Sequence, residues 1–467
     1  MGSSEIMHPD GAQITAFGVT PVASRLALRA VSPTLPAMSA PANVSPVDEV
    51  LPRRAGHLSI VDFGGEAIIY DPVRRQAHLL NPTAALVLDR CDGETTLAAL
   101  TGDLAGVYRA DPDTVERDVR AAVDGFRTLL LLVDPAVTGP SITEDEATPM
   151  GFDPPPVPPD PPPNLSTPLP HHPLPDDWPY VSPVFSALDA HVRIRADDPV
   201  IGRYIDQVFA SLILTSGDRG TAESQEEADG RSVSTLDLFA GDGPIRLLLD
   251  GDEIGTGHDA NGAVAILHWQ LNQLAIEATS SKILLHASAV RRPGGVAVFP
   301  AESNSGKSTL AAGLVRAGFG YVTDEAVAVD PETGCVVPFP KPISLDPGAW
   351  PLFADCKPSM AGATETFFHH EWHLDPRVLD PAALVDLVTE QPVTMVAFPQ
   401  YVEGAPTSLE PMRPAEVMLG LLRNAFNLAT VGPAAIGALA TIARQAAGFR
   451  LTVGDLDEAV DLIRSAP

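Results

Sequence analysis

Hydrophobic residues in the first third of the chain alternate at strand spacing before they recur at helix spacing. The run "HLSIVDFGGEAIIYDP" (57–72) holds two short stretches of β-forming residues separated by Gly64-Gly65, which predicts a hairpin. A third β-rich run, "RRQAHLLNP" (74–82), ends at Asn81-Pro82. We therefore predict three strands in this region.

Three stretches with apolar residues at helical spacing follow. They lie at 83–93, 95–110 and 111–133, and the last begins with a capping Asp111 and an early proline. Three strands and three helices in about 80 residues predict a small α+β module of the winged-helix type. We assign this module to residues 52–135.

The segments that flank this module lack lasting periodicity. Residues 1–51 mix Pro, Ser, Ala and Gly, and we expect a disordered N-terminal leader. Residues 149–183 hold 15 prolines in 35 positions, which excludes helix and sheet and favours polyproline II. We interpret 136–183 as a Pro-rich interdomain linker; a ligand for a proline-recognition domain is the alternative.

The patterns of a globular domain return at about residue 184. The expected elements, in order, are a hairpin at 234–253, a helix at 263–279, strands at 282–290 and 294–300, a loop, a helix at 308–318, a strand at 321–330, a β run at 393–402, a helix at 415–427 and a closing helical pair up to Pro467. The order of strand, loop, helix and strand is the context of a phosphate-binding loop. It predicts an α/β P-loop domain at 184–467.

The loop itself reads "AESNSGKST" (301–309). In such loops, backbone N–H groups surround an anion at a helix N-terminus, Lys307 would neutralise the β and γ phosphates, and Ser308 would hold Mg²⁺. Ala301 replaces the first glycine at the strand exit, and Asn304 tolerates the left-handed conformation. The predicted cofactors are ATP and Mg²⁺; an ordinary strand-to-helix turn is the alternative. The candidate nucleotide-binding residues are Ala301, Ser303, Asn304, Ser305, Gly306, Lys307, Ser308 and Thr309.

Asp324 and Glu325 end the apolar stretch "YVTDE" that follows the loop helix. In a doubly wound sheet this strand would run beside the loop strand and bring both carboxylates to the Mg²⁺. One would accept a hydroxyl proton while the other holds the metal with Ser308, and either assignment is open. His286, on the preceding strand, could orient the base. A solvated strand end and a core histidine are the alternatives.

Two further polar clusters give weaker signals. "FFHHEWH" (367–373) lacks the HExxH spacing, although His369 and His373 could share a metal on a helix; a polar surface or loop is the alternative. "DGDEIGTGHDANG" (250–262) lacks the oxygen spacing of an EF-hand, and we expect a hairpin loop there.

Composition limits the possible partners. Thirty Lys and Arg against sixty Asp and Glu give a net charge of −30, which disfavours nucleic acid and anionic membranes and suits a basic peptide. Three cysteines make no disulfide framework. The chain has no long apolar run and no signal-peptide pattern at its start, so we expect a cytoplasmic protein.

The segments "LLHASAV", "GGVAVFPAESNSGKSTLAAGLVRAGFGYVTDEAVAV" and "PETGCVVPFPKPISL" resemble the HPr kinase/phosphorylase family, in particular its stand-alone bacterial relatives in peptide-modification clusters. The resemblance covers about 184–465 and implies an active site of His286, Lys307, Ser308, Asp324 and Glu325. Two positions depart from the family: Ala301 replaces a glycine and Glu325 a second aspartate. No counterpart of the HPr-docking region is evident, so HPr is not expected as substrate, and the hexameric family implies a possible homo-oligomer.

The first module resembles PqqD-like domains, the recognition elements of ribosomally made, post-translationally modified peptides (RiPPs). The resemblance rests on "HLLNPTAALVLDRCDGETTLAALTGDL" and "DPDTVERDVRAAVDGF". It implies that a leader peptide adds as a strand beside 76–80, against the third helix. The implied peptide-binding residues are Gln76, His78, Leu80, Val115, Val119 and Val123.

Together the two resemblances predict a RiPP biosynthesis protein that binds a precursor leader and transfers phosphate from ATP to a Ser or Thr hydroxyl. Two alternatives stay open. One is a non-catalytic recognition scaffold with a degenerate kinase-like domain. The other is a nucleotide-dependent enzyme with different chemistry on the peptide, such as phosphorylation before elimination.

Overall fold

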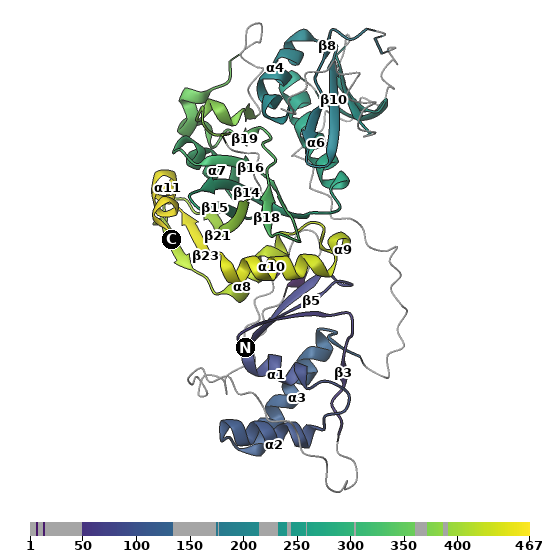
Figure 1. Cartoon of the computed structure of the whole chain (residues 1–467), viewed down its shortest axis with the longest axis vertical. Helices are drawn as coiled ribbons and strands as arrows, with labels where there is room; N and C mark the ends of the chain where they lie inside the picture. The colour runs from purple at the N-terminus through teal and green to yellow at the C-terminus, as the bar shows by residue number, and fades with distance from the viewer. Residues whose placement is uncertain are drawn as a thin grey trace, which may run out of the picture. The chain divides into compact units, whose positions relative to one another are not determined.

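The computed structural model describes most of the chain and divides it into two compact units (Figure 1). The described residues are 6–7, 13–14, 49–133, 174–175, 177–213, 232–240, 244–257, 259–302, 305–359, 371–385 and 391–467. The first unit contains Met1–Met150 and Arg413–Arg423, and the second contains Gly151–Met412 and Asn424–Pro467. Most of the expected leader and of the proline-rich run lies outside the described residues. Within 1–51, β1 (Ile6–Met7) and β2 (Gln13–Ile14) form an antiparallel pair.

The first unit is built on an antiparallel sheet of three strands. β4 (Ser59–Phe63), β5 (Glu66–Asp71) and β6 (Gln76–Leu80) lie in sequence order. Gly64 and Gly65 both have positive φ in the turn between β4 and β5, which confirms the predicted hairpin. A second, short pair joins β3 (Arg53–Arg54) to β7 (Leu132–Val133).

Three helices follow these strands and share a hydrophobic core with them. α1 (Pro82–Asp89), α2 (Leu97–Tyr108) and α3 (Pro112–Thr128) follow the caps Asn81, Thr96 and Asp111, whose side chains accept hydrogen bonds from the first helical turn. The helices and the sheet share one hydrophobic core, which includes Ile69, Leu80, Val87, Leu100, Val119 and Phe126. The unit thus has the mixed α/β content that the sequence predicts.

One helix of the first unit comes from far along the chain. α8 (Pro414–Arg423) packs against β5 and β6, and Arg413 forms an ion pair with Glu66. Ile68 and Tyr70, which alternate with the core residue Ile69 along β5, are buried as well. The sequence places this helix in the second domain, because a linear pattern does not show which sheet a helix covers.

The second unit contains two main sheets. The first has the strand order β13-β12-β11-β10-β8, with β9 beside β10, and α6 contacts several of its strands. Its elements are β8 (Tyr180–Val181), β9 (Phe185–Ala187), β10 (Ala190–Ala196), α4 (Pro199–Phe209), η2 (Ala210–Leu212), β11 (Ser234–Phe239), β12 (Ile245–Leu249), β13 (Asp252–Gly257) and α6 (Ala260–Ala278). β8 lies within the range assigned to the linker, so the exclusion of sheet there is wrong at Tyr180–Val181, which pair with β10 between two prolines. The expected loop at 250–262 is instead a tight turn at Asp250-Gly251, the strand β13 and the start of α6.

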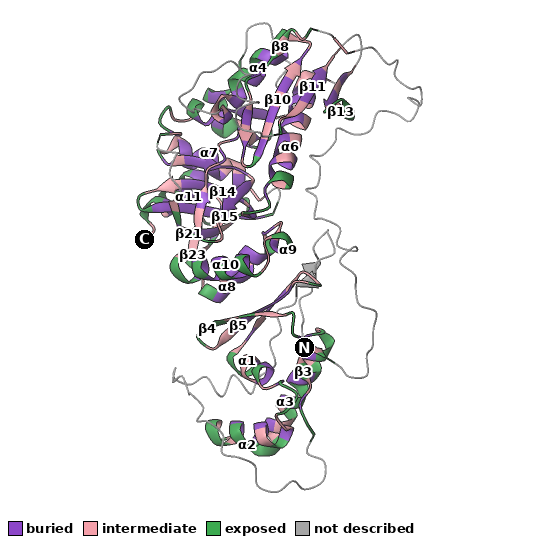
Figure 2. Ribbon diagram, turned by 45° about the vertical axis from the view of Figure 1, so that its right-hand side comes forward, coloured by how far each residue is buried: buried purple, intermediate pink, exposed green. Residues whose placement is uncertain are grey.

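The second sheet has the order β15-β14-β17-β18-β21-β23-β22, with β16 beside β14, and β15 also pairs with β21. Its strands are β14 (Ile283–Arg292), β15 (Gly295–Pro300), β16 (Gly320–Thr323), β17 (Ala326–Val329), β18 (Cys335–Val337), β21 (Gln391–Tyr401), β22 (Ser408–Pro411) and β23 (Ala447–Val453). The other elements here are α7 (Lys307–Arg316), the pair β19 (Ile343–Leu345) and β20 (Trp372–Leu374), η3 (Trp350–Cys356), η5 (Pro376–Val378), α9 (Leu428–Val431), α10 (Pro433–Gln445) and α11 (Leu456–Ser465). Figure 2 shows that the central strands of this unit are largely buried. One core cluster extends through both sheets, for example Phe209, Leu236, Leu267, Phe299 and Tyr321.

The strand order corrects one prediction. The strand after the loop helix, β16, does not run beside the loop strand β15, because β14 lies between them. The short Pro293-Gly294 connection makes β14 and β15 an antiparallel hairpin, and β21 pairs with β15 in parallel. The free edge of β14 is therefore the place where β16 and β17 add.

Candidate functional site

The candidate phosphate loop connects β15 to the first turn of α7. Gly306 caps α7 with φ +87°, a conformation that strains any residue with a Cβ atom. Ala301 is not among the residues with positive φ, so its position does not require glycine for conformational reasons. Its N–H donates to the carbonyl of His286 on β14 at 3.3 Å. Ser303 and Asn304 lie outside the described residues.

Lys307 is folded back into this loop. Its Nζ donates to the carbonyls of Ala301 at 2.8 Å and Glu302 at 2.7 Å, and only 7% of the residue is exposed. Burial lowers the pKa of Lys307 to about 8, although the charges of Asp324, Glu325 and Glu302 oppose the shift. The Lys307 ammonium therefore lies at the N-terminus of α7, where the nearby carboxylates only partly offset the cost of burying its charge.

Asp324 lies directly after β16 and is 1% exposed. Its carboxylate accepts a hydrogen bond from the Ser308 side chain in the first turn of α7. Burial raises the pKa of Asp324, and Lys341, the Ser308 hydrogen bond and Lys307 oppose that rise. Its Oδ1 atom is buried and has no hydrogen-bond partner among the described residues. An unsatisfied carboxylate oxygen beside a hydroxyl can ligate an Mg²⁺ ion that also binds phosphate oxygens, or it can accept a proton.

Glu325 directs its carboxylate elsewhere. Its Oε2 accepts from the Asn272 side chain at 2.8 Å and lies 3.1 Å from the Lys341 ammonium. The residue has φ +86°, a strained conformation for a non-glycine residue that costs on the order of 1–3 kcal/mol. The sequence leaves the roles of the two acids interchangeable, whereas these contacts place Asp324 beside Ser308 and Glu325 beside Lys341.

His286 lies at the junction of the strands that carry the loop and the acidic pair. It is paired with Ala326 in the β14–β17 register, and its ring lies 5.6 Å from that of Phe426. The next N–H on β14, that of Ala287, donates to the Glu325 carbonyl at 3.2 Å. The main chain thus brings His286, the loop and the acidic pair close together.

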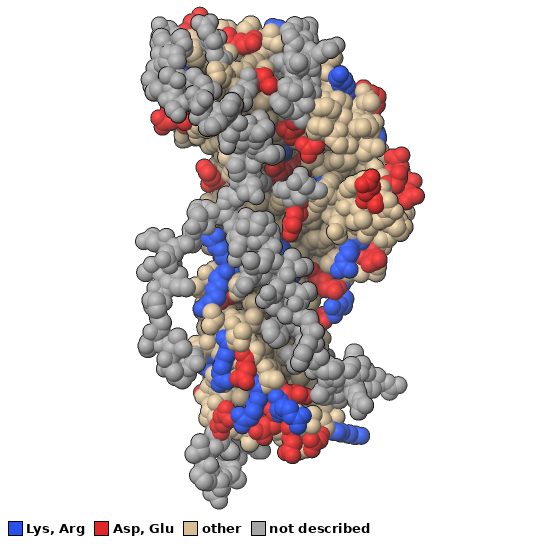
Figure 3. Space-filling view, turned by 180° about the vertical axis from the view of Figure 1, so that it is seen from behind, with Lys and Arg blue, Asp and Glu red and all other residues tan. Residues whose placement is uncertain are grey.

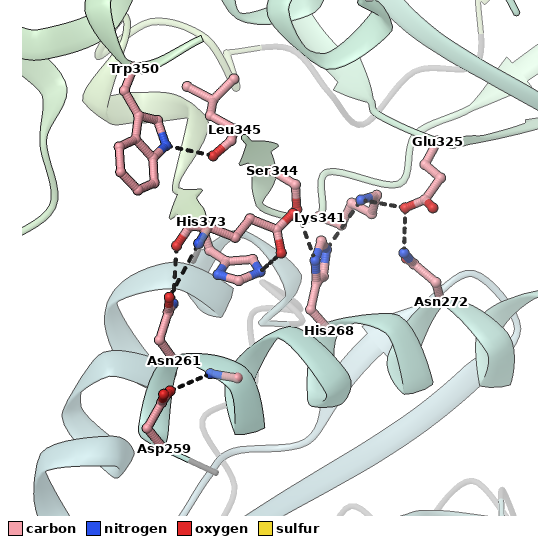
Figure 4. A network of polar contacts seen from close by, with 12 residues as sticks. Asp259, Asn261, His268, Asn272, Glu325, Lys341, Ser344, Leu345, Trp350 and His373 are labelled. Carbon is pink, nitrogen blue, oxygen red and sulfur yellow. Dashed lines mark hydrogen bonds and ion pairs between the residues drawn. The ribbon is translucent and has the colours of Figure 1, made fainter. Parts of the chain in front are cut away.

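Sequence reasoning missed three residues of this site. Lys341, in the segment before β19, and Asn272, on α6, contact Glu325 directly, and His268 on α6 contacts Lys341 (Figure 4). Lys341 is fully buried, and its carbonyl accepts from the Tyr321 hydroxyl at 2.9 Å. A lysine inside the apolar run "VVPFPKPISL" was the available signal, since a buried lysine requires a partner.

The alternative histidine metal site falls partly outside the described residues, because His369 and His370 are not described. His373 lies on β20, a strand, and its Nε2 is 3.2 Å from Glu371 Oε2. In the part of the chain that the structure describes, no three His, Cys, Asp or Glu side chains gather as a metal site. An Mg²⁺ ion beside Asp324 would therefore depend on Ser308 and on phosphate oxygens for further ligands.

The predicted peptide-binding side chains in the first unit are mostly interior. Leu80, Val115, Val119 and Val123 belong to the core cluster, and His78 is 2% exposed. Gln76 is half-buried at the start of β6. Contact with an added strand would thus come from the main chain of β6 rather than from these core side chains.

Charge in the first unit differs from the average of the chain. Residues 49–133 contain 9 Arg, no Lys and 13 Asp or Glu, so their net charge is 9 − 13 = −4 against −30 for the whole chain. Figure 3 shows blue and red side chains intermixed over this unit. The bulk acidity therefore says little about the peptide that this unit would accept.

Comparison with known proteins supports one of the two resemblances. Residues 66–132, from β5 to the start of β7, match the model of the PqqD family, coenzyme PQQ synthesis protein D. No curated protein matches the chain. A solved HPr(Ser) kinase/phosphatase from Coxiella burnetii aligns at 13% identity over 39% of this chain and 93% of its own, with a TM-score of 0.20. A TM-score this low gives no evidence about the fold or the function of the second unit.

No helix in the described ranges combines the length and the apolar character that crossing a bilayer requires.

Proposed function

We propose that this protein binds the leader of a ribosomally made precursor peptide and transfers phosphate from ATP to a Ser or Thr hydroxyl of that peptide. The PqqD-like match supports the binding half of the proposal. One observation carries the catalytic half: Ser308, at the N-terminus of a helix, donates to the buried Asp324, and Lys307 lies beside both.

ATP phosphates would bind at the N-terminus of α7, where backbone N–H groups and Lys307 supply positive charge. Ser308 and the phosphate oxygens would hold Mg²⁺, and the metal would neutralise charge on the phosphates. The hydrogen bond to Asp324 orients the Ser308 hydroxyl so that its lone pairs face the ion. Lys307 would exchange the carbonyls of Ala301 and Glu302 for phosphate oxygens.

Asp324 would accept the proton of the attacking hydroxyl. Its Oδ1 has no hydrogen-bond partner in the part of the chain that the structure describes, and burial raises its pKa, which makes it a better proton acceptor than an exposed carboxylate. The hydroxyl oxygen forms a bond to the γ-phosphorus, the bond to the leaving oxygen breaks, ADP leaves, and the proton moves to Asp324.

Lys307→Ala is expected to abolish phosphate transfer and to leave leader binding unchanged, because Lys307 lies in the second unit and leader binding in the first. The assay incubates the full chain with Mg·ATP and candidate precursor peptides and measures a phosphate-sized mass gain by mass spectrometry. Lys357→Ala, at an exposed lysine, is the matched control and should transfer normally. Undiminished transfer by Lys307→Ala would contradict the proposal.

A specific observation favours the alternative of a non-catalytic scaffold. Ala301 replaces the first glycine, and the carbonyls of Ala301 and Glu302 already occupy the Lys307 ammonium. The scaffold predicts no Mg·ATP binding and an unchanged product when Asp324→Asn is tested. A nucleotide-dependent enzyme with other chemistry would bind Mg·ATP but yield a peptide without the added phosphate.

A further inference from the structure

Lys341 is a fully buried ammonium with two observed polar partners. Its Nζ lies 3.1 Å from Glu325 Oε2 and 3.1 Å from His268 Nε2. A buried cation costs several kcal/mol of desolvation, and apolar residues of similar volume often replace buried ion pairs without loss of stability. Fold stability alone therefore gives little reason for a lysine here, directly behind a candidate active-site acid.

The second partner of Lys341 is a neutral imidazole. Burial, and then the charges of Lys341 and His373, hold the pKa of His268 well below its usual range. An ammonium can only donate, so Nε2 of His268 must accept, and Nδ1–H then donates to Ser344 Oγ at 3.2 Å. His268 thus anchors the lysine to α6 without adding a positive charge (Figure 4).

Glu325 is held from two sides by this arrangement. Asn272, one turn of α6 beyond His268, and Lys341 both contact its Oε2 atom. Its backbone is strained at φ +86°, and a strained residue keeps its conformation only when its surroundings hold it. Glu325 is the residue between Asp324 and the start of β17 at Ala326, so its backbone conformation sets the position of Asp324.

We propose that Lys341 is a positioning residue of the phosphoryl-transfer site, which holds Glu325, and through its strained backbone Asp324, in the geometry needed for proton acceptance. This inference rests on the proposed function. Several elements contribute charged or titratable groups that interact with Lys341, namely Asp324, Glu325, Lys307, His268 and Glu371. His373 interacts with His268 in the same cluster.

The first test compares phosphate transfer by wild type and Lys341→Met, which keeps the length and removes the charge. We expect kcat to fall about 10²-fold, the usual effect of losing one preorganised electrostatic group. The KM for Mg·ATP should change far less than kcat, because Lys341 contacts Glu325 and His268 rather than the phosphate loop. Full kcat in Lys341→Met would overturn the inference.

A double-mutant cycle separates positioning from a general loss of stability. Glu325→Gln keeps the size of a half-exposed side chain and removes the same ion pair. If the lysine acts through Glu325, the double variant should be no slower than the slower single variant. Additive losses would show that Lys341 does not act through Glu325. If Lys341→Met does not fold, Glu325→Gln alone must still lower kcat, and an undiminished kcat would overturn the proposal.

A second measurement does not depend on catalysis. In protein labelled with ¹⁵N, with Glu325→Gln to assign the signal, the amide resonance of Glu325 reports the geometry of its strained backbone. Lys341→Met should shift this resonance, because the Glu325 carboxylate loses one of the two groups that hold it. If wild type transfers no phosphate, the proposed function fails, and this measurement still decides the role of Lys341. An unchanged Glu325 resonance would refute that role.

Discussion

At the scale of the residue, Lys307 would make the proposed nucleotide binding depend on pH. Its pKa is lowered to about 8, so the free protein loses the ammonium as pH rises above 8, whereas bound phosphates would keep it protonated. We expect the Kd for Mg·ATP to be flat below pH 8 and to rise about tenfold per unit above it. Isothermal titration calorimetry between pH 7 and 9 measures this, with Lys307→Ala as the variant that should lack the slope. A flat wild-type profile would contradict the expectation.

The residues that the sequence predicts for the site are those that short-range motifs identify. Lys307 and Ser308 stand in one loop, and Asp324 follows the next strand, so their proximity follows from one strand-loop-helix-strand unit. Lys341 and His268 are 73 positions apart, and only packing of α6 against the segment before β19 brings them together. No pattern in the sequence links such positions.

At the scale of the element, the position of α7 depends on a close contact with α11. A Cβ atom on Gly313 of α7 would lie 2.8 Å from a methyl group of Leu456, the first residue of α11. Gly313→Ala should therefore push the helices apart and destabilise the second unit by about 1–3 kcal/mol. Denaturant unfolding, monitored on the full chain, measures this change.

Gly437→Ala is the matched control for that substitution. Gly437 is exposed within α10, and a Cβ atom there would meet no atom within 4 Å. Alanine has the higher helix propensity, so this variant should gain about 0.5–1 kcal/mol. Equal effects of the two substitutions would mean that the α7–α11 contact does not limit the stability of this unit.

Most helices and strands are evident from periodicity, whereas strand order is not. The Gly64-Gly65 hairpin and α3 follow from local signals: a turn with positive φ and an N-cap followed by proline. The neighbour of β16 follows from which edge of β14 is free, and this depends on β21, far along the chain. For the same reason, the sequence predicts a helical pair at the C-terminal end but misses β23, which separates those helices by pairing with β21.

At the scale of the whole molecule, the first unit is discontinuous in sequence. A fragment of residues 49–133 lacks α8, so Ile68 and Tyr70 on β5 would lose the cover that α8 gives to β5 and β6. Burial of each such side chain stabilises a protein by about 1.5–3 kcal/mol. We expect the fragment to bind a hydrophobic dye and to unfold at lower temperature than the same fragment fused to residues 413–423. Equal melting temperatures would contradict this role of α8.

The discontinuity also affects the order of events during synthesis. β5 leaves the ribosome long before α8, the helix that packs against β5 and β6. The first unit therefore cannot be completed until translation has passed residue 423. During that interval its exposed apolar strand is a natural client for chaperones. Substitutions in α8 would accordingly reduce the yield of folded protein even where they leave the phosphate loop unaltered.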